Sequence, residues 1–189
     1  AADQLIERYG DDLLVVAYYD DQWAVDAGAT YVVFGPVLGP MSLALADAKL
    51  MGEQPSDVVV RAGGVGDVNG DGYGDVLVGA QSNDRGGTNA GAGYLVYGPM
   101  SGDIVLSNAG AILPGEAAGD ALGAPVSAAG DVDGDGYFDF LLGAPNHDQG
   151  GSDSGSVYLI YGGGLRSTHD SPAGADWPPA TFPASTCPP

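Results

Sequence analysis

The feature that most constrains the fold of this chain is a threefold internal repeat of about 63 residues. The segment Tyr-Val-Val-Phe-Gly-Pro at 31–36 returns in similar form at 94–99 and at 158–163, with offsets of 63 and 64. An ungapped alignment of 67–99 with 131–163 gives 18 identities in 33 positions. A second segment, an aspartate followed by apolar residues, repeats in step at 12–17, 75–80 and 139–144. Repeats of this period are typical of arrays of one supersecondary unit.

Each repeat has the pattern of short β-strands. The runs at 75–80 and 94–97 are rich in β-branched and aromatic residues, and a polar, Gly-rich connection separates them, which predicts a hairpin with a long loop. The same pair occurs at 139–144 and 158–161. We expect two further strands per repeat, near 58–65 and 122–129 before the hairpin and near 43–51 and 103–113 after it. The composition of 41–51 also suits a helix, but its register with 100–113 favours an outer strand.

Four strands per repeat predict an all-β fold of β-propeller-type blades, with about three four-stranded antiparallel repeats. The expected boundaries are 1–53, 54–117 and 118–164 for the three blades, followed by a Pro-rich tail at 165–189. Residues 180–183 resemble 111–114, so the tail holds either a last outer strand or an irregular linker. Because propellers usually have four to eight blades, we expect these blades to be part of a larger propeller or to be completed by assembly.

A nine-residue aspartate loop, found twice, carries the strongest chemical signal. Acidic or amide side chains stand at positions 1, 3, 5 and 9, and glycine stands at position 6. Ca²⁺ takes six to eight oxygen ligands, and a glycine allows the sharp turn that brings them together. We therefore predict two structural Ca²⁺ ions, with the carbonyls of the position-7 tyrosines as further ligands. The predicted ligands are Asp67, Asn69, Asp71, Tyr73 and Asp75 in the first loop, and Asp131, Asp133, Asp135, Tyr137 and Asp139 in the second.

The surroundings of the two loops disfavour a helical calcium module. An EF-hand requires Glu at position 12, where this chain has Val78 and Leu142 inside apolar strands. The alternative, a pair of metal-free Asp/Gly turns, leaves aligned carboxylates to repel one another. The matching stretch of repeat one, aligned as 3–11, has Leu5 and Arg8 at ligand and turn positions, so we predict no calcium there. The second loop has four carboxylates against three in the first, which predicts tighter binding.

Residues 66–80 resemble an FG-GAP repeat of the integrin alpha type, and Leu122-Gly123, the 131–139 loop and Gly143-Ala144-Pro145 resemble it more closely. The resemblance covers roughly residues 1–163. It implies a calcium-stabilised β-propeller of extracellular or cell-surface proteins, with structural metal loops on one face. Known members of this family usually have seven blades.

The composition excludes several partners. The chain has 25 Asp and Glu against 5 Lys and Arg, a net charge of -20, which argues against nucleic acid because such binding needs a basic surface. No run approaches 18 apolar residues, so no transmembrane segment is expected. The single Cys187 forms no internal disulfide.

No catalytic motif stands out, so we predict a non-enzymatic module for adhesion or interaction with a protein or a glycan. In a four-stranded blade the 81–92 and 145–156 loops emerge opposite the metal loops. His147 is expected as a solvated loop residue, because Asn83 is its counterpart, and the aspartates beside them are expected to close turns. The alternatives are a propeller attached to a secreted enzyme, such as a phospholipase or a polysaccharide-degrading enzyme, and a structural subunit that packs against copies of itself. The predicted partner-binding residues are Asn83, Asp84, Arg85, His147 and Asp148.

Overall fold

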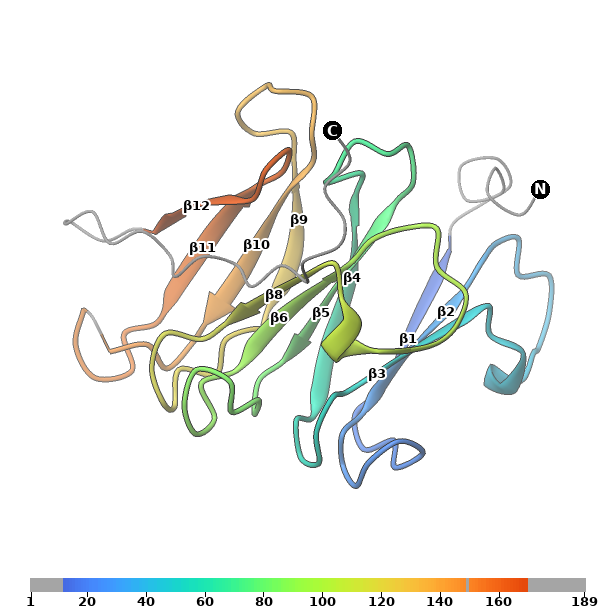
Figure 1. The fold of residues 1–189 in the computed structure, drawn as a ribbon, viewed down its shortest axis with the longest axis horizontal. Coiled ribbons are helices and arrows are strands. Elements are labelled where there is room, and N and C mark those ends of the chain that lie inside the picture. Colours follow the sequence, from blue (N-terminus) through green and yellow to red (C-terminus); the bar gives the residue numbers. More distant parts are fainter. Residues whose placement is uncertain (1–11, 149, 170–189) are drawn as a thin grey trace.

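The computed structural model describes residues 12–148 and 150–169, which form three four-stranded sheets standing side by side (Figure 1). We call the sheets blades 1, 2 and 3. Blade 1 contains β1 (Leu13–Ala17), β2 (Ala29–Val33), β3 (Ala48–Met51) and β7 (Gly102–Val105). Blade 2 contains β4 (Val59–Gly66), β5 (Asp75–Ala80), β6 (Ala92–Val96) and β8 (Ala111–Pro114). Blade 3 contains β9 (Val126–Gly130), β10 (Asp139–Ala144), β11 (Ser156–Tyr161) and β12 (Arg166–His169).

The predicted all-β class and blade-like strand order are confirmed. Blades 2 and 3 are antiparallel, and each follows the chain from its first strand outward. The central hairpins share one register, in which an apolar residue faces a tyrosine on the next strand. These pairs are Val15 with Tyr31, Val78 with Tyr94 and Leu142 with Tyr158. The described residues form an open row of blades rather than a closed ring (Figure 1).

The segment 103–113 differs from the single outer strand expected. It splits into β7 and β8, which belong to different blades and are separated by a 3-10 turn, η2 (Leu106–Asn108). β7 pairs in parallel with β3 of blade 1, whereas β8 pairs with β6 of blade 2. In this turn Leu106 is fully buried in the cluster between the two blades. The matching segment of repeat one likewise holds a turn, η1 (Leu43–Leu45), before β3, so neither a strand nor a helix spans 43–51.

β12 is the outermost strand of blade 3 and begins at residue 166, within the predicted tail. The stretch 180–183, considered as a last strand, and the whole of the degraded loop at 3–11 lie outside the described residues. The predicted blade boundaries remain predictions.

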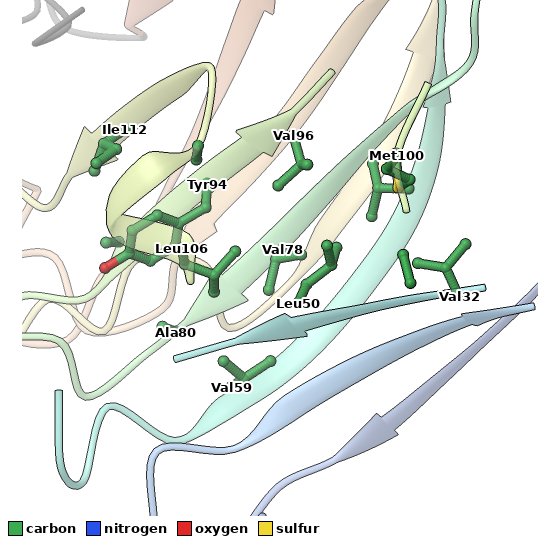
Figure 2. Packing of buried hydrophobic residues seen from close by; sticks show 14 residues of the cluster. Val32, Leu50, Val59, Val78, Ala80, Tyr94, Val96, Met100, Leu106 and Ile112 are labelled. Atoms are coloured by element: carbon green, nitrogen blue, oxygen red, sulfur yellow. The ribbon is translucent and has the colours of Figure 1, made fainter. Parts of the chain in front are cut away.

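Apolar cores between neighbouring blades hold the row together. Val32 and Leu50 of blade 1 lie in one buried cluster with Val78, Tyr94 and Val96 of blade 2 (Figure 2). A second cluster joins Leu77 and Leu95 of blade 2 to Phe140, Leu142 and Tyr158 of blade 3. Each large apolar side chain buried in this way contributes about 1.5–3 kcal/mol, so every blade depends on its neighbour for stability.

The two sets of hairpin loops lie at opposite ends of the blades. The β4–β5 and β9–β10 loops, which contain the aspartates, project from one end, and the β5–β6 and β10–β11 loops project from the other (Figure 1). This arrangement agrees with the placement expected from the strand order.

Candidate functional site

In the first aspartate loop, position 1 organises the turn. The carboxylate of Asp67 accepts hydrogen bonds from the backbone N–H groups of Gly70 at 2.7 Å, Asp71 at 3.1 Å and Gly72 at 2.8 Å. Gly70 and Gly72 have positive φ, a conformation that an L side chain rarely adopts. The loop therefore winds around one carboxylate and turns its alternate side chains toward the same side.

The second loop repeats this geometry. Asp131 accepts hydrogen bonds from the N–H groups of Gly134 at 2.7 Å, Asp135 at 3.1 Å and Gly136 at 3.0 Å. In both loops the position-5 carboxylate accepts from the N–H of the position-7 tyrosine, at 2.9 and 3.0 Å. The two loops differ at position 3, yet they form the same set of backbone hydrogen bonds.

The position-9 aspartates are buried and tie each loop to its blade. Asp139 accepts from the N–H of Val132 at 2.7 Å and of Gly162 at 2.9 Å. Asp75 makes the equivalent bonds, both at 2.9 Å. Burial raises the pKa of Asp75 to about 6, assisted by the nearby charges of Asp71 and Asp67 and opposed by these two bonds.

The corresponding aspartate of repeat one is Asp12 rather than Asp11. Asp12 accepts from the N–H of Gly35 at 2.9 Å, the bond that Asp75 and Asp139 make to Gly98 and Gly162. The alignment of 3–11 with the loops was therefore one residue out of register, because the strand register places Asp12 at position 9.

The donor set of the second loop fits a calcium ion. Asp131, Asp133 and Asp139 each offer a carboxylate oxygen, and the three oxygens lie within 4.8 Å of one another. Ligands 2.3–2.6 Å from one Ca²⁺ are at most about 5 Å apart, so a single ion can contact all three. Asp135 is not part of this group. In the first loop an amide, Asn69, replaces the carboxylate of Asp133. The roles of the Tyr73 and Tyr137 carbonyls remain predictions.

The two loops touch each other across the boundary between blades 2 and 3. The ring of Tyr137 lies where a side chain on Gly70 would stand, and the backbone N–H of Gly163 donates to the carbonyl of Val68 at 2.9 Å. The conformation of one loop therefore constrains the conformation of the other.

At the opposite end of the blades, Asn83 is fully buried in a polar cluster. Its amide nitrogen donates to Asp57 Oδ1 at 3.0 Å and to the Tyr94 hydroxyl at 2.9 Å. Glu53 receives a two-pronged ion pair from Arg85, with both distances 2.7 Å. Burial opposes ionisation of Glu53, but the bonds from Arg85 and Asn83 outweigh it and lower its pKa. Burial raises the pKa of Asp57.

The prediction that His147 is a solvated loop residue was wrong. Its side chain is buried, and Nδ1 lies 2.9 Å from Asp120 Oδ2. Nε2 is 3.9 Å from Glu116, and the ring meets Tyr158 edge to face. The segment that links blades 2 and 3 brings Asp120 over the loop and covers the histidine. His147 and Asn83 therefore occupy equivalent buried positions in successive blades.

The other predicted partner residues also have structural contacts. Asp84 and Asp148 each accept from a backbone N–H five residues later, at 2.8 Å in both cases, so they close their loops. Asp21 does the same in blade 1 at 2.7 Å. Whether any of these residues binds a partner remains a prediction.

Sequence reasoning missed an exposed apolar group on the β1–β2 loop. Tyr19, Trp23 and Val25 are 68%, 56% and 64% exposed, and Tyr18 accepts a hydrogen bond from Arg61 at 3.0 Å. The repeat alignment contained the signal. It places these large residues where the other blades have Gln81, Ser82, Gly86 and Thr88, or Pro145, Asn146, Gly150 and Ser152.

Comparison with known proteins identifies the repeat. The FG-GAP repeat family matches residues 57–96 and 123–160, which cover blade 2 up to β6 and most of blade 3. The chain carries FG-GAP repeats. Both matched segments contain an aspartate loop and its hairpin, as the resemblance of the motifs implied.

Two longer proteins are similar to this FG-GAP chain. Phosphatidylinositol-glycan-specific phospholipase D of Bos taurus is 31% identical over 176 residues, which are 90% of the chain and 21% of that protein. Integrin alpha-IIb of Homo sapiens is 35% identical over 124 residues, 63% of the chain and 12% of that protein. The chain thus spans 21% of the length of the first relative and 12% of the second. Within residues 12–148 and 150–169, no helix has the length and apolar character needed to cross a membrane.

Proposed function

We propose that this FG-GAP chain is an extracellular, non-catalytic β-propeller module in which two Ca²⁺ ions are structural. The observation that carries the proposal is the cluster of Asp131, Asp133 and Asp139, whose oxygens lie within 4.8 Å of one another. Asp67, Asn69, Asp71 and Asp75 would hold the second ion in the equivalent loop. Bound calcium would offset the mutual repulsion of these carboxylates and pin each loop to its blade.

The role proposed for calcium is stability rather than catalysis. In each loop the side-chain ligands come from nine consecutive residues, and position 9 is buried against the blade. An ion that binds the folded state and not the unfolded chain stabilises folding in proportion to the logarithm of its concentration. Two ions would change the net charge from -20 to -16, since each adds two positive charges.

A thermal melt in chelator and across a calcium titration, with bound metal counted at saturation, tests this proposal. We expect a rising melting temperature and two ions per chain. Magnesium at the same concentration is the control, because Mg²⁺ demands a tighter octahedral shell. If calcium neither raised the melting temperature nor bound to the chain, the loops would be turns that hold no metal.

The partner is proposed to be a protein or a glycan that binds the end of the blades opposite the metal loops. The predicted residues Asn83, Asp84, Arg85, His147 and Asp148 lie at that end, where the exposed Tyr19 and Trp23 also lie. Exposed aromatic side chains are enriched in interfaces because they bury a large area at low entropic cost. Trp23→Ala should reduce ligand capture by this face, whereas Leu45→Ala, an exposed residue of η1 outside this loop, should not.

An accessory propeller of a secreted enzyme is the second candidate. The similarity to a phospholipase D over 90% of the chain favours it. In that case catalysis resides in another domain, and the FG-GAP chain alone has no hydrolase activity. Phospholipase activity of the isolated chain that survives removal of calcium would contradict both candidates.

A further inference from the structure

We propose that Asn69, in the first aspartate loop, is a self-modifying residue. The backbone nitrogen of Gly70 attacks the side-chain amide of Asn69, which loses ammonia and becomes an aspartate. The change gives the first loop the position-3 carboxylate that the second loop has in Asp133. Every group that takes part belongs to blade 2, so the reaction does not depend on a ligand or on another domain.

The residue after Asn69 sets it apart from the other four asparagines of the chain. Asn69 is followed by a glycine, whereas the other four are followed by residues that carry a side chain, namely Asp84, Ala90, Ala109 and His147. Because glycine has no Cβ, its nitrogen approaches the preceding side chain with the least hindrance. Asn69 and Gly70 are both exposed, so water reaches the product of the attack.

The loop folds the Asn69 side chain back toward the peptide that attacks it. Asn69 Oδ1 accepts a hydrogen bond from the backbone N–H of Asp71 at 3.0 Å, which closes an Asx turn over the intervening Gly70. The two reacting groups are thereby held close together before the reaction begins. Such positioning removes much of the entropic cost of bringing them into contact.

Two aspartates contact the atoms that change protonation or charge in this reaction. Asp67 Oδ1 accepts from the N–H of Gly70 at 2.7 Å, so it is placed to take the proton that this nitrogen loses. The N–H of Asp71 faces Asn69 Oδ1, where negative charge develops during the attack, and stabilises that charge as an oxyanion-hole donor does. Asp71 Oδ2 accepts from Asn69 Nδ2, the leaving nitrogen, at 2.9 Å.

The reaction has two steps, and neither oxidises nor reduces any group. In the first, a bond forms between Gly70 N and Asn69 Cγ and the Cγ–Nδ2 bond breaks. The proton from Gly70 N passes through Asp67 to the leaving nitrogen, which departs as ammonia and leaves a cyclic imide. In the second, water adds to Cγ, the bond from Cγ to Gly70 N breaks, and this nitrogen regains a proton. The products are an aspartate at position 69 and an intact backbone.

The second loop shows that the aspartyl product fits this backbone. Asp133 Oδ1 accepts from the N–H of Asp135 at 3.2 Å, the bond that Asn69 makes with Asp71. If water instead adds to the main-chain carbonyl of the imide, the product is isoaspartate, which adds one carbon to the backbone before Gly70. That carbon would displace the N–H groups that donate to Asp67. The folded loop should therefore favour aspartate over isoaspartate.

The modification would make the calcium affinity of the first loop rise as the chain ages. The aspartyl form carries the four carboxylates of the second loop, and ligand charge raises affinity for Ca²⁺. This consequence rests on the proposed calcium sites, whereas the covalent change does not. A chain that loses ammonia at Asn69 but binds no calcium would refute the calcium proposal and leave the modification standing.

Peptide mapping by mass spectrometry, on the full chain stored in chelator at neutral pH, tests the reaction. We expect aspartate at position 69, with oxygen taken up from isotopically labelled water, and no change at Asn108, an exposed asparagine of the same chain. The folded chain should react at least about tenfold faster than the chain unfolded in urea, because only the folded loop places Asp67 and the Asp71 N–H. An Asn69 that stays intact, reacts faster when unfolded, or yields mainly isoaspartate would overturn the proposal.

Two variants test the role of the loop itself. Asp133→Asn places an asparagine before Gly134, whose N–H donates to Asp131 at 2.7 Å, and position 133 should return to aspartate at a rate within about tenfold of that at Asn69. Asp67→Asn removes the proton acceptor and should slow the reaction at Asn69 at least about tenfold, whereas Asp103→Asn on β7 should not. Thermal melts check that each variant folds. An asparagine that persists at position 133, or equal rates in the other two variants, would contradict catalysis by the loop.

Discussion

The backbone N–H of Phe138, in the second aspartate loop, donates to the carbonyl oxygen of Asp67, the first residue of the first loop, at 3.1 Å. The two proposed metal sites are therefore joined through one hydrogen bond across the boundary between blades 2 and 3. Asp67, whose carboxylate organises the first loop, thus also holds the backbone of the second loop through its carbonyl oxygen. Calcium binding to the two loops should accordingly be coupled.

Asp67→Asn should weaken calcium binding by the first loop. The substitution takes away a charged ligand and replaces one acceptor oxygen with an N–H donor, which faces the loop N–H groups. We expect calcium affinity of the first loop to fall on the order of 100-fold, and that of the second loop to fall by a smaller factor. Titration calorimetry measures both. Asp103→Asn, an exposed aspartate on β7, controls for the lost charge; equal effects of the two variants would contradict the site.

Asn69→Asp should strengthen calcium binding by the first loop. The change gives this loop the four carboxylates of the second, and ligand charge raises affinity for Ca²⁺. Without calcium the same change should lower the melting temperature, because it adds a carboxylate beside Asp71. The diagnostic result is stronger calcium binding together with a lower melting temperature in the absence of calcium. Asn108→Asp, outside the loops, should show neither effect.

Glu53→Gln should make the chain less stable at neutral pH and remove part of its acid sensitivity. The folded pKa of Glu53 is lowered, so its ion pair with Arg85 contributes stability above the unfolded pKa of about 4.3 and loses it as the pH falls through the folded pKa. We expect a loss of about 1–3 kcal/mol at pH 7 that narrows below about pH 4. Urea unfolding at both pH values measures it; a difference that widens in acid would refute the assignment.

Much of the blade pattern could be predicted because local signals agreed with the repeat. The central hairpins combine a turn signal with apolar runs, and their strands formed where expected. The hydrogen bonds by which Asp75 and Asp139 tie the loops to the blades were not predicted. The segment 103–113 could not be assigned, because the choice between one strand and two depends on Leu106 becoming buried between two blades. Burial against a distant strand leaves no local sequence pattern.

The polar end of the blades was harder to predict for the same reason. Nothing within the 145–156 loop shows that His147 will meet Asp120, which lies 27 residues earlier in the chain. The signal that was available lies in the repeat: Glu53 and Asp57 recur as Glu116 and Asp120, 63 residues later. Acids that keep this spacing beside an amide in one blade and a histidine in the next indicate a shared buried cluster.

Gly66→Ala should destabilise the chain more than Gly130→Ala, although both glycines end the strand before an aspartate loop with positive φ, +80° and +75°. An alanine at either position is strained by this positive φ, which costs about 1–2 kcal/mol. At Gly66 the added Cβ would also overlap the ring of Phe138 in blade 3, whereas at Gly130 it would meet no atom within 4 Å. We expect about 1–3 kcal/mol more destabilisation at Gly66, measured by urea unfolding in calcium. Equal losses would show that Phe138 does not hold blade 2 and blade 3 together at this point.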